Sequence, residues 1–194
     1  MMNDLVAKAK EWREAAARNA LFRLGLVVAV FVAVVDQGSK YWIVNVLGLP
    51  DRLVPCAKQA DAMCAQVPLL PIFDLTFVRN YGMSFGLFAG GIASRIVLSA
   101  ITFSIAAGLI VWLGRLERRI AAIGIGFIIG GAIGNLYDRV TYGYVVDFLD
   151  FSGLYFPWVF NVADAAINVG VALLLLDAWL DRDNQSNVET TAKT

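Results

Sequence analysis

The fold is decided by residues 120–136, which read IAAIGIGFIIGGAIGNL and contain no ionisable side chain. A helix needs about 20 predominantly apolar residues to cross a bilayer core, so this run predicts a transmembrane helix. Gly126, Gly130 and Gly134 recur every four residues and lie on one face of that helix. Small residues at this spacing let membrane helices pack backbone against backbone. We therefore expect these glycines to bring the ends of neighbouring helices together.

Three further apolar stretches, at residues 24–46, 92–113 and 159–180, are also long enough to span a bilayer. The composition of the whole chain agrees, because 59% of its 194 residues are hydrophobic and 16% are charged. Soluble domains are less apolar and carry more charge. The sequence thus predicts an all-α polytopic membrane protein with four transmembrane helices.

The chain divides into three parts around these helices. Residues 1–20 mix apolar and basic side chains and are interpreted as a cytoplasmic, interfacial amphipathic segment, with a frayed polar tail as the alternative. Residues 21–181 form a single membrane-embedded domain, in which residues 47–91 and 137–158 are the loops on the outer face. Residues 182–194 are polar and are expected to be a disordered cytoplasmic tail.

The distribution of lysine and arginine predicts that both termini are cytoplasmic. With this orientation ten of these residues lie on the inner side, whereas the outer loops hold Arg52, Lys58, Arg79 and Arg139. Cytoplasmic loops are enriched in Lys and Arg, so this distribution favours the orientation over its inverse. The net charge of zero gives no electrostatic reason to expect nucleic acid as a partner.

The outer loop at residues 47–91 is large enough to fold by itself. Within it, residues 73–79 are β-prone and roughly alternate in polarity, residues 80–82 favour a turn, and residues 84–88 are suited to a returning strand. We therefore expect a small β-sheet on the outer membrane surface.

The chain has no histidine and two cysteines, Cys56 and Cys64. The lack of histidine excludes a Ser-His-Asp triad, a Cys-His dyad and a His-liganded zinc site. The cysteines lie in an outer loop where a disulfide is allowed, and the sequence leaves open whether it forms. No nearby residue would activate a catalytic cysteine. Any catalysis must therefore come mainly from carboxylates, lysine, serine or tyrosine.

Five acidic residues collect on the outer side in this topology: Asp36, Asp138, Asp147, Asp150 and Asp164. Ionisable groups at membrane depth are costly and indicate function by default, although some of the five are expected to end helices or pair with bases. Two carboxylates held together can share one proton, so that one activates water while the other donates to a carbonyl. This chemistry needs neither a metal nor a cofactor. Asp164, at the start of an apolar helix, is the strongest candidate, and the residues leave its partner open among the other four.

Two other classes of protein fit a membrane bundle that contains acids. A transporter or proton channel would string ionisable residues across the bilayer, whereas these residues cluster at one face. A metal-dependent lipid phosphatase would use carboxylates as ligands and would lose its activity in chelator. A Ser-Lys protease built on Ser39 and Lys40 is disfavoured, because adjacent residues on a helix do not face each other.

Four sequence blocks resemble the lipoprotein signal peptidase family (signal peptidase II, or prolipoprotein signal peptidase) and cover nearly everything from the first predicted span to the last. They are residues 36–40 (DQGSK), 79–85 (RNYGMSF), 130–139 (GGAIGNLYDR) continued by 143–148 (GYVVDF), and 160–167 (FNVADAAI). Each block alone is a weak match, whereas all four in order and at the predicted membrane positions are specific. Met83 and Ser84 stand where the family often has two alanines, so a pocket or β-loop of different shape is expected here.

The resemblance implies an aspartic endopeptidase in which Asp147 and Asp164 are the catalytic pair. It also implies supporting or substrate-binding roles for a further set of residues: Asp36, Lys40, Asn80, Gly82, Asn135, Asp138, Arg139 and Asn161. Among these, Asp138 and Arg139 are expected to form a buried pair that holds the third span against the following loop.

Two further contacts are expected from the chemistry of this set. Asn135 and Asn161 carry amides that can hydrogen-bond the catalytic pair or the substrate backbone. Lys40 is expected to pair with Asp36, which lies one helical turn before it.

The family also implies the substrate and the location. Its members remove signal peptides from diacylglyceryl-modified prolipoproteins, cleaving before the lipidated cysteine, during bacterial lipoprotein maturation. The expected partners are these substrates, membrane lipids and cyclic-peptide antibiotics that block the catalytic pair. The expected location is the bacterial inner membrane, with the active site at the periplasmic face.

Overall fold

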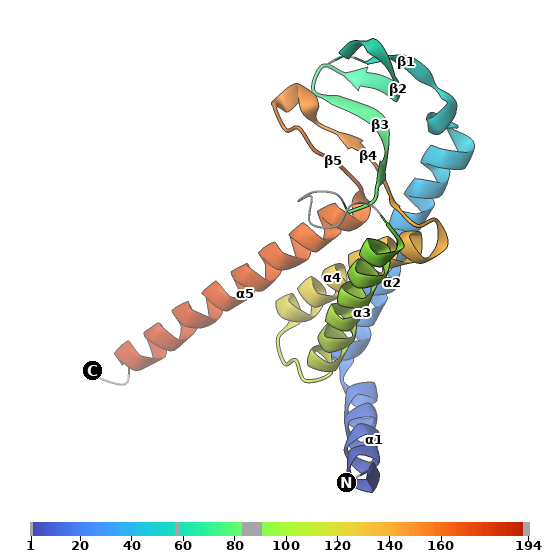
Figure 1. The fold of residues 1–194 in the computed structure, drawn as a ribbon. Helices are drawn as coiled ribbons and strands as arrows, with labels where there is room; N and C mark the ends of the chain where they lie inside the picture. Colours follow the sequence, from blue (N-terminus) through green and yellow to red (C-terminus); the bar gives the residue numbers. More distant parts are fainter. Residues whose placement is uncertain (1, 57–58, 83–90, 192–194) are drawn as a thin grey trace.

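The computed structural model describes residues 2–56, 59–82 and 91–191 and is mostly helical (Figure 1). Within these ranges the α-helices are α1 (Met2–Arg18), α2 (Ala20–Tyr41), α3 (Ile92–Leu113), α4 (Arg119–Thr141) and α5 (Val162–Thr191), and α2 continues as the π-helix η1 (Trp42–Val46). Four helical segments of the described chain are long and apolar enough to cross a membrane: Ala20–Val46, Ile92–Leu113, Arg119–Thr141 and Val162–Arg182. The predicted four-helix membrane fold is therefore confirmed.

Two helices differ from their predicted bounds. α4 runs to Thr141 instead of ending at residue 136, so Asp138 lies inside the helix. The predicted end at residue 136 came from the apolar run, which stops before the charged Asp138. A helix can continue through a charged residue whose charge is neutralised, and the Lys40 ammonium lies 2.9 Å from the Asp138 carboxylate. α5 begins at Val162, after a short strand, and continues to Thr191 through much of the segment that the sequence predicts to be a disordered tail.

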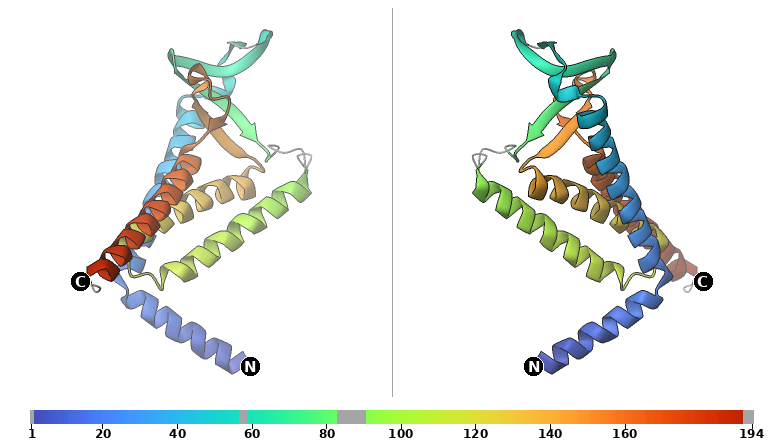
Figure 2. Two further views of the ribbon diagram at one scale, coloured as in Figure 1. Left: turned by 90° about the vertical axis from the view of Figure 1, so that its left-hand side faces the viewer. Right: turned by 90° about the vertical axis from the view of Figure 1, so that its right-hand side faces the viewer.

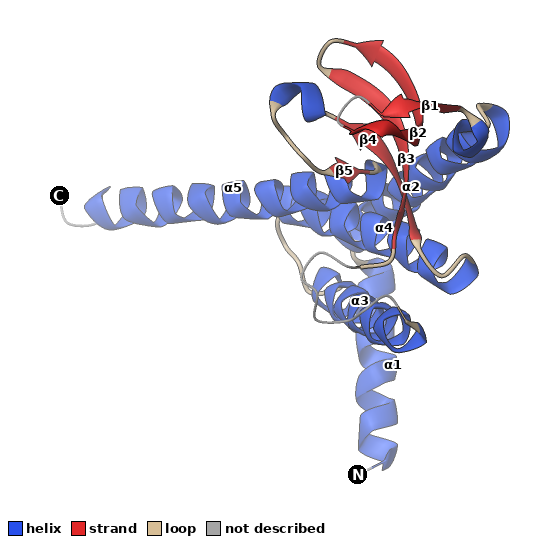
Figure 3. Ribbon diagram, turned by 45° about the horizontal axis from the view of Figure 1, so that its top comes forward, coloured by secondary structure: helices blue, strands red, loops and turns tan. Residues whose placement is uncertain are grey.

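A five-stranded antiparallel sheet accompanies the helices (Figure 3). Its strands, in the order in which they pair, are β1 (Leu53–Cys56), β2 (Gln59–Leu70), β3 (Phe73–Asn80), β4 (Val145–Asp150) and β5 (Val159–Phe160). Short 3₁₀ turns, η2 (Leu49–Asp51) and η3 (Ser152–Leu154), flank the sheet strands.

The sheet is confirmed, but its pairing differs from the prediction. β3 forms where expected, whereas the returning strand proposed at residues 84–88 lies outside the described residues. The neighbour of β3 is instead β4, from a segment predicted to be a loop, with Val78 opposite Asp147 and Asn80 opposite Val145. Residues far apart in the sequence thus meet across this pair of strands.

β1 and β2 come from the part of the outer loop that contains both cysteines. Cys64 lies opposite Val54 in the β1–β2 ladder and is disulfide-bonded. The chain has one other cysteine, Cys56, whose side chain lies outside the described residues. The disulfide that the sequence left open is therefore present at Cys64.

α4 lies at the centre of the bundle and packs closely against α2 and α5. A Cβ atom added at Gly126 would lie 2.6 Å from the backbone oxygen of Gly25 on α2, and one at Gly130 would lie 2.5 Å from that of Ala29. On another face of α4, a Cβ at Gly124 would lie 2.9 Å from the backbone oxygen of Gly170 on α5. The predicted backbone-to-backbone packing is confirmed for Gly126 and Gly130, whereas a Cβ added at Gly134 would meet the side chain of Asp36.

The sheet stands at one end of the helical bundle, and both chain ends lie toward the other end (Figure 2). We call these the sheet end and the termini end. At the termini end, Trp12 of α1 packs edge-on against Phe22 of α2, with ring centroids 6.0 Å apart. The predicted N-terminal amphipathic segment is thus helical from Met2 to Arg18 and rests on the first span.

Candidate active site

Asp164 lies in the first turn of α5, where it is held by a capping box. The side-chain oxygen of Asn161 accepts a hydrogen bond from the Asp164 backbone N–H at 2.9 Å, and an Asp164 carboxylate oxygen accepts one from the Asn161 backbone N–H at 3.3 Å. This reciprocal arrangement satisfies two N–H groups that a helix start leaves unpaired. The other carboxylate oxygen of Asp164 accepts from the Asn135 side chain of α4 at 2.8 Å. The carboxylate is thereby fixed where the helix dipole stabilises negative charge.

Asp147 lies in the middle of β4, and only 1% of it is exposed. One of its carboxylate oxygens accepts a hydrogen bond from the Asn161 side chain at 2.6 Å, and the other accepts from Asn80 on β3 at 2.9 Å. Burial, followed by the negative charge of Asp164, raises the pKa of Asp147 from 3.8 to about 7, although both amides and Lys40 oppose this rise. Asp147 therefore exchanges its proton close to neutral pH.

Asn161 joins the two acids, because its side chain donates to Asp147 while its backbone N–H donates to Asp164. Asn135 completes the link, since it accepts from the Asn161 side chain at 3.2 Å and donates to Asp164. The structure thus brings together the two aspartates that the sequence blocks single out. It also places both predicted asparagines on them, since Asn161 hydrogen-bonds both acids and Asn135 hydrogen-bonds Asp164.

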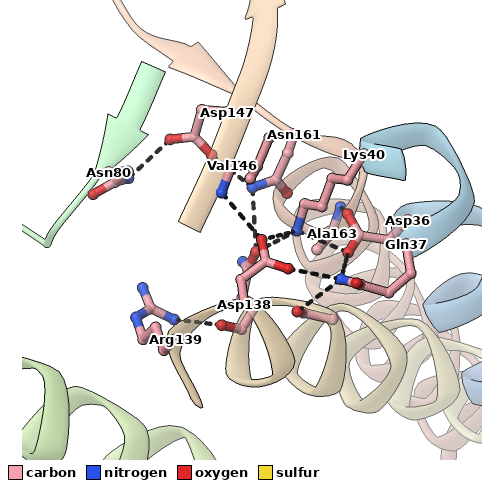
Figure 4. A network of polar contacts seen from close by, with 12 residues as sticks. Asp36, Gln37, Lys40, Asn80, Asp138, Arg139, Val146, Asp147, Asn161 and Ala163 are labelled. Carbon is pink, nitrogen blue, oxygen red and sulfur yellow. Dashed lines mark hydrogen bonds and ion pairs between the residues drawn. The ribbon is translucent and has the colours of Figure 1, made fainter. Parts of the chain in front are cut away.

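A buried group of charges, formed by Asp36, Lys40 and Asp138, lies near Asp147 (Figure 4). The Lys40 ammonium of α2 contacts Asp36 at 2.8 Å, Asp138 of α4 at 2.9 Å and the side-chain oxygen of Asn135 at 3.2 Å. The predicted pairing of Lys40 with Asp36 is confirmed. All three charged side chains are at least 96% buried. Because Lys40 contacts both acids, neither one is left without a counter-charge in the low-dielectric interior.

The expected pairing of Asp138 with Arg139 is wrong. These neighbours on α4 project about 100° apart, so they face different sides of the helix. Asp138 points toward α2 and Lys40, whereas Arg139 lies at the hydrogen-bonding limit, 3.5 Å, from the Asn135 backbone oxygen on the side of Asp164. Arg139 is thus placed beside the acidic pair and does not tie the helix to the following loop.

The buried charges also hold the backbone next to each acid of the pair. Asp36 accepts a hydrogen bond from the backbone N–H of Ala163 at 2.9 Å, one residue before Asp164. Asp138 accepts one from the backbone N–H of Val146 at 3.0 Å, one residue before Asp147. The group therefore sets the positions of α5 and β4 relative to α2 and α4.

Gln37 contacts the same buried group of charged side chains, although its position in the sequence predicted no role for it. Its amide nitrogen lies 2.9 Å from Asp138, 3.1 Å from Asp36 and 3.1 Å from the Gly134 backbone oxygen (Figure 4). The motif spacing would have revealed Gln37 only if the position of α4 had been known, because its partners on α4 lie about 100 residues away.

Asn80 and Gly82 form a turn at the end of β3. The side-chain oxygen of Asn80 accepts a hydrogen bond from the Gly82 backbone N–H at 2.8 Å, and Gly82 has a φ of 81° that favours glycine. This turn aims the Asn80 amide at Asp147. Met83 and Ser84, where the sequence departs from the family pattern, lie outside the described residues.

Asp150, another acid considered as the partner of Asp164, lies three residues after Asp147 and so points to the opposite face of β4. It accepts hydrogen bonds from Thr76 at 2.7 Å and from the Ser152 backbone N–H at 2.9 Å. These contacts bind the sheet together and separate Asp150 from the pair.

A cavity of about 310 Å³ opens beside Asp164 between α3, α4 and α5. Its polar lining is Asn135, Arg139, Asp164 and Thr102, and isoleucine and alanine side chains line the rest. The acid thus faces a largely apolar space within the membrane-spanning bundle.

Four membrane-spanning helices with a sheet at one end define a multi-pass membrane protein, and the linked Asp147 and Asp164 are its candidate active site. The family model described as signal peptidase (SPase) II matches residues 28–180. A lipoprotein signal peptidase of Caulobacter vibrioides is 48% identical over 168 residues, which cover 86% of this chain and 93% of that protein. One of Rhizorhabdus wittichii is 41% identical over 170 residues, covering 86% and 92%.

A solved structure described as a bacterial membrane enzyme, determined by the in meso method at 2.3 Å resolution, superimposes with a TM-score of 0.66. It is 27% identical, and the match covers 83% of this chain and 90% of that one. The chain therefore belongs to the signal peptidase II family, a family of membrane proteases.

Proposed function

We propose that this protein is an aspartic endopeptidase that removes signal peptides from prolipoproteins, with Asp147 and Asp164 as its catalytic residues. The observation that supports this assignment most strongly is the bridge through Asn161, whose side chain donates to Asp147 and whose backbone N–H donates to Asp164. Family membership supports the substrate class.

In the proposed mechanism the pair holds one proton. Asp147, whose pKa is raised to about 7, carries it and donates it to the scissile carbonyl oxygen. Asp164, in the first turn of α5, is the base that takes a proton from the attacking water. Asn80, Asn135 and Asn161 hold the two carboxylates in place during both proton transfers.

We further propose that the substrate is cleaved before a diacylglyceryl-modified cysteine. The apolar cavity beside Asp164 opens between spans, where acyl chains can remain in the bilayer while the peptide reaches the acids. Arg139 lines this cavity and supplies a cation for the carbonyl or ester oxygens of the lipidated peptide. Cyclic peptides that mimic the substrate are expected to bind in the same place.

The proposed location is the bacterial inner membrane with both termini cytoplasmic and the sheet end periplasmic. Ten Lys and Arg residues against four support this orientation, as does the position of both chain ends away from the sheet (Figure 2). In this orientation α1 lies at the cytoplasmic surface.

The test is to compare Asp147→Asn, Asp164→Asn and Asp150→Asn in a cleavage assay with a lipidated prolipoprotein. Loss of either catalytic carboxylate is expected to lower turnover at least about a thousandfold, as for other catalytic groups. Asp150→Asn, on the same strand but outside the pair, is expected to remain active. Near wild-type turnover by a folded Asp147→Asn or Asp164→Asn variant would refute the assignment.

A further inference from the structure

A second cavity, of about 460 Å³, lies between the sheet ends of α2 and α4 and the start of β4. Among the described residues that line it, neither Asp147 nor Asp164 appears. Its lining combines four tyrosines with three polar side chains and two valines: Tyr41, Tyr137, Tyr142, Tyr144, Gln37, Lys40, Asn45, Val44 and Val146. The proposed protease reaction makes no use of this space.

The walls of this cavity, which we call the tyrosine cavity, are aromatic. The rings of Tyr137 and Tyr142 lie 6.4 Å apart at 79°, and those of Tyr142 and Tyr144 lie 6.2 Å apart at 34°. Tyr41 and Tyr142 are more than half exposed, so their faces are open to a ligand. Clustered aromatic faces attract cations and form the cages that bind ammonium groups. The guanidinium of Arg79 already lies over the Tyr144 ring, 5.6 Å from its centroid, so Tyr41, Tyr137 and Tyr142 supply the faces for a ligand.

The one cationic side chain in the lining has no hydrogen left for an anion. An ammonium group carries three N–H donors, and those of Lys40 point to Asp36, Asp138 and Asn135. The two N–H donors of Gln37 are likewise used within the buried group. A phosphate or carboxylate entering the tyrosine cavity would therefore find neither of these donors available.

Acceptors remain in the same lining. The amide nitrogen of Gln37 faces the buried acids, and among the described residues no donor reaches its side-chain oxygen. Asn45 donates to the Tyr41 backbone oxygen at 3.3 Å, which leaves its own side-chain oxygen without a described donor. Two amide oxygens are thus free to accept hydrogen bonds from a ligand.

The net charge of the buried group next to the tyrosine cavity also favours a cation as its ligand. Asp36, Asp138 and Lys40 together carry a formal charge of −1 and are buried, so water screens them weakly. Burial and then the neighbouring Tyr137 and Asp138 raise the pKa of Tyr142, so Tyr142 remains a neutral ring at physiological pH.

The position of the tyrosine cavity points to a lipid. Tyr41 and Asn45 lie in the last turns of the Ala20–Val46 span, and Tyr137 lies in the last turns of the Arg119–Thr141 span. The ends of membrane-spanning helices lie at the level of the lipid headgroups. Tyr41 and Asn45 also lie at the change from α2 to the π-helix η1, a distortion that is frequent at functional sites.

We propose that the tyrosine cavity binds the primary ammonium of a membrane phospholipid, phosphatidylethanolamine, between the tyrosine rings and the side-chain oxygens of Gln37 and Asn45. A primary ammonium has three N–H donors for these acceptors, whereas a quaternary ammonium has none. The glycerol and acyl chains would follow the surfaces of α2 and α4 into the bilayer.

The experiment titrates the full-length protein, delipidated in detergent, with dioleoyl phosphatidylethanolamine, phosphatidylcholine or phosphatidylglycerol, and counts bound lipid by native mass spectrometry. The wild-type protein is expected to bind phosphatidylethanolamine more tightly than either of the other two. Tyr142→Leu and Asn45→Leu are each expected to weaken phosphatidylethanolamine binding at least about threefold, as the loss of one cation–π or hydrogen-bond contact predicts. Phe103→Leu, a control for an exposed aromatic on α3, is expected to leave it unchanged.

Equal binding of the three lipids, or an equal loss of all three in Tyr142→Leu, would show a merely apolar surface and overturn the proposal. Unchanged phosphatidylethanolamine binding in both cavity variants would also overturn it. Soluble phosphoethanolamine is tested in parallel. If it bound the wild-type protein as tightly as the lipid does and lost affinity in the same variants, the ligand would be a soluble amine and not a lipid.

Discussion

The carboxylate of Asp138 accepts a hydrogen bond from the backbone N–H of Val146 at 3.0 Å and so attaches α4 to the strand that carries Asp147. Asp138 is fully buried and is also the second anionic partner of Lys40. One side chain thus neutralises a charge and positions the strand that carries Asp147.

These two tasks can be separated by comparing Asp138→Asn with Asp138→Leu. Both variants lose the negative charge, but only asparagine keeps an oxygen for the Val146 N–H. Because an unsatisfied buried N–H costs about 1–3 kcal/mol, Asp138→Leu is expected to be less stable than Asp138→Asn by about that amount. Its kcat is also expected to be the lower of the two, because the strand that carries Asp147 is no longer held. Equal kcat values in two folded variants would mean that this hydrogen bond does not position Asp147.

Lys40→Met is expected to destabilise the protein strongly. It leaves Asp36 and Asp138 buried without a counter-charge, and breaking such a pair costs about 3–5 kcal/mol. Lys8→Met is the matched control, because Lys8 also pairs with an aspartate four residues earlier, at 3.2 Å, but both side chains are well exposed. Its effect is expected to stay below about 1 kcal/mol. Unfolding in detergent measures both, and similar losses would contradict the assigned role of burial.

Activity is expected to fall as the pH rises through about 7. The pKa of Asp147 is raised to about 7, and the proposed reaction needs its proton, so deprotonation removes the acid of the pair. Lys40 lowers this pKa, so any Lys40→Met protein that folds should keep its activity to higher pH. The dependence of kcat/KM on pH measures both, and a profile that stays flat from pH 6 to 9 would argue against Asp147 as the acid.

The free energy of unfolding should also depend on the protonation of Asp147. Because the folded pKa of Asp147 lies above its ordinary value of 3.8, the folded state binds the proton more tightly than the unfolded state. The resulting stability is fully present below about pH 4 and is lost as the pH rises toward 7. Asp147→Asn lacks this titration, so wild type is expected to lose stability relative to Asp147→Asn between pH 4 and 7. A constant difference between the two proteins would contradict the raised pKa.

Gly130→Ala is expected to cost about 1–3 kcal/mol of stability and to lower activity. The added Cβ would lie 2.5 Å from the Ala29 backbone oxygen and 2.7 Å from Val32, so α2 and α4 would have to separate. Gly108→Ala on α3 is the control, since nothing lies within 4 Å of its added Cβ and alanine favours a helix. Thermal unfolding distinguishes them, and equal melting temperatures would contradict the close packing.

Local patterns in the sequence predicted the helices and the contacts within them. Apolar length located four spans, the four-residue glycine spacing located the packing face of α4, and helical spacing paired Lys40 with Asp36. The contacts that were missed or mistaken join distant segments. β4 was predicted as a loop because its partner β3 lies about 70 residues earlier, and Asp138 was paired with its neighbour Arg139 because Lys40 lies 98 residues away.

The partner of Asp164 shows the same limit. The spacing of the acidic residues left four candidates for the partner of Asp164. Only the resemblance of residues 143–148 to a family pattern selected Asp147 among them. Three-dimensional contacts support the same proposal: Lys40 holds Asp36 and Asp138, Asp150 points to the other face of β4, and Asn161 donates to Asp147. None of these contacts has a signature in linear spacing.

The capping box at Asn161 and Asp164 has a consequence for biosynthesis. The start of α5 supplies one of the two proposed catalytic carboxylates, the amide that bridges them, and the N–H that Asp36 accepts. If Asp147 and Asp164 are the catalytic pair, a nascent chain that has inserted only its first three spans lacks one of the two acids and the Asn161 amide that links them. The proposed protease would then become active only after the last span has entered the bilayer.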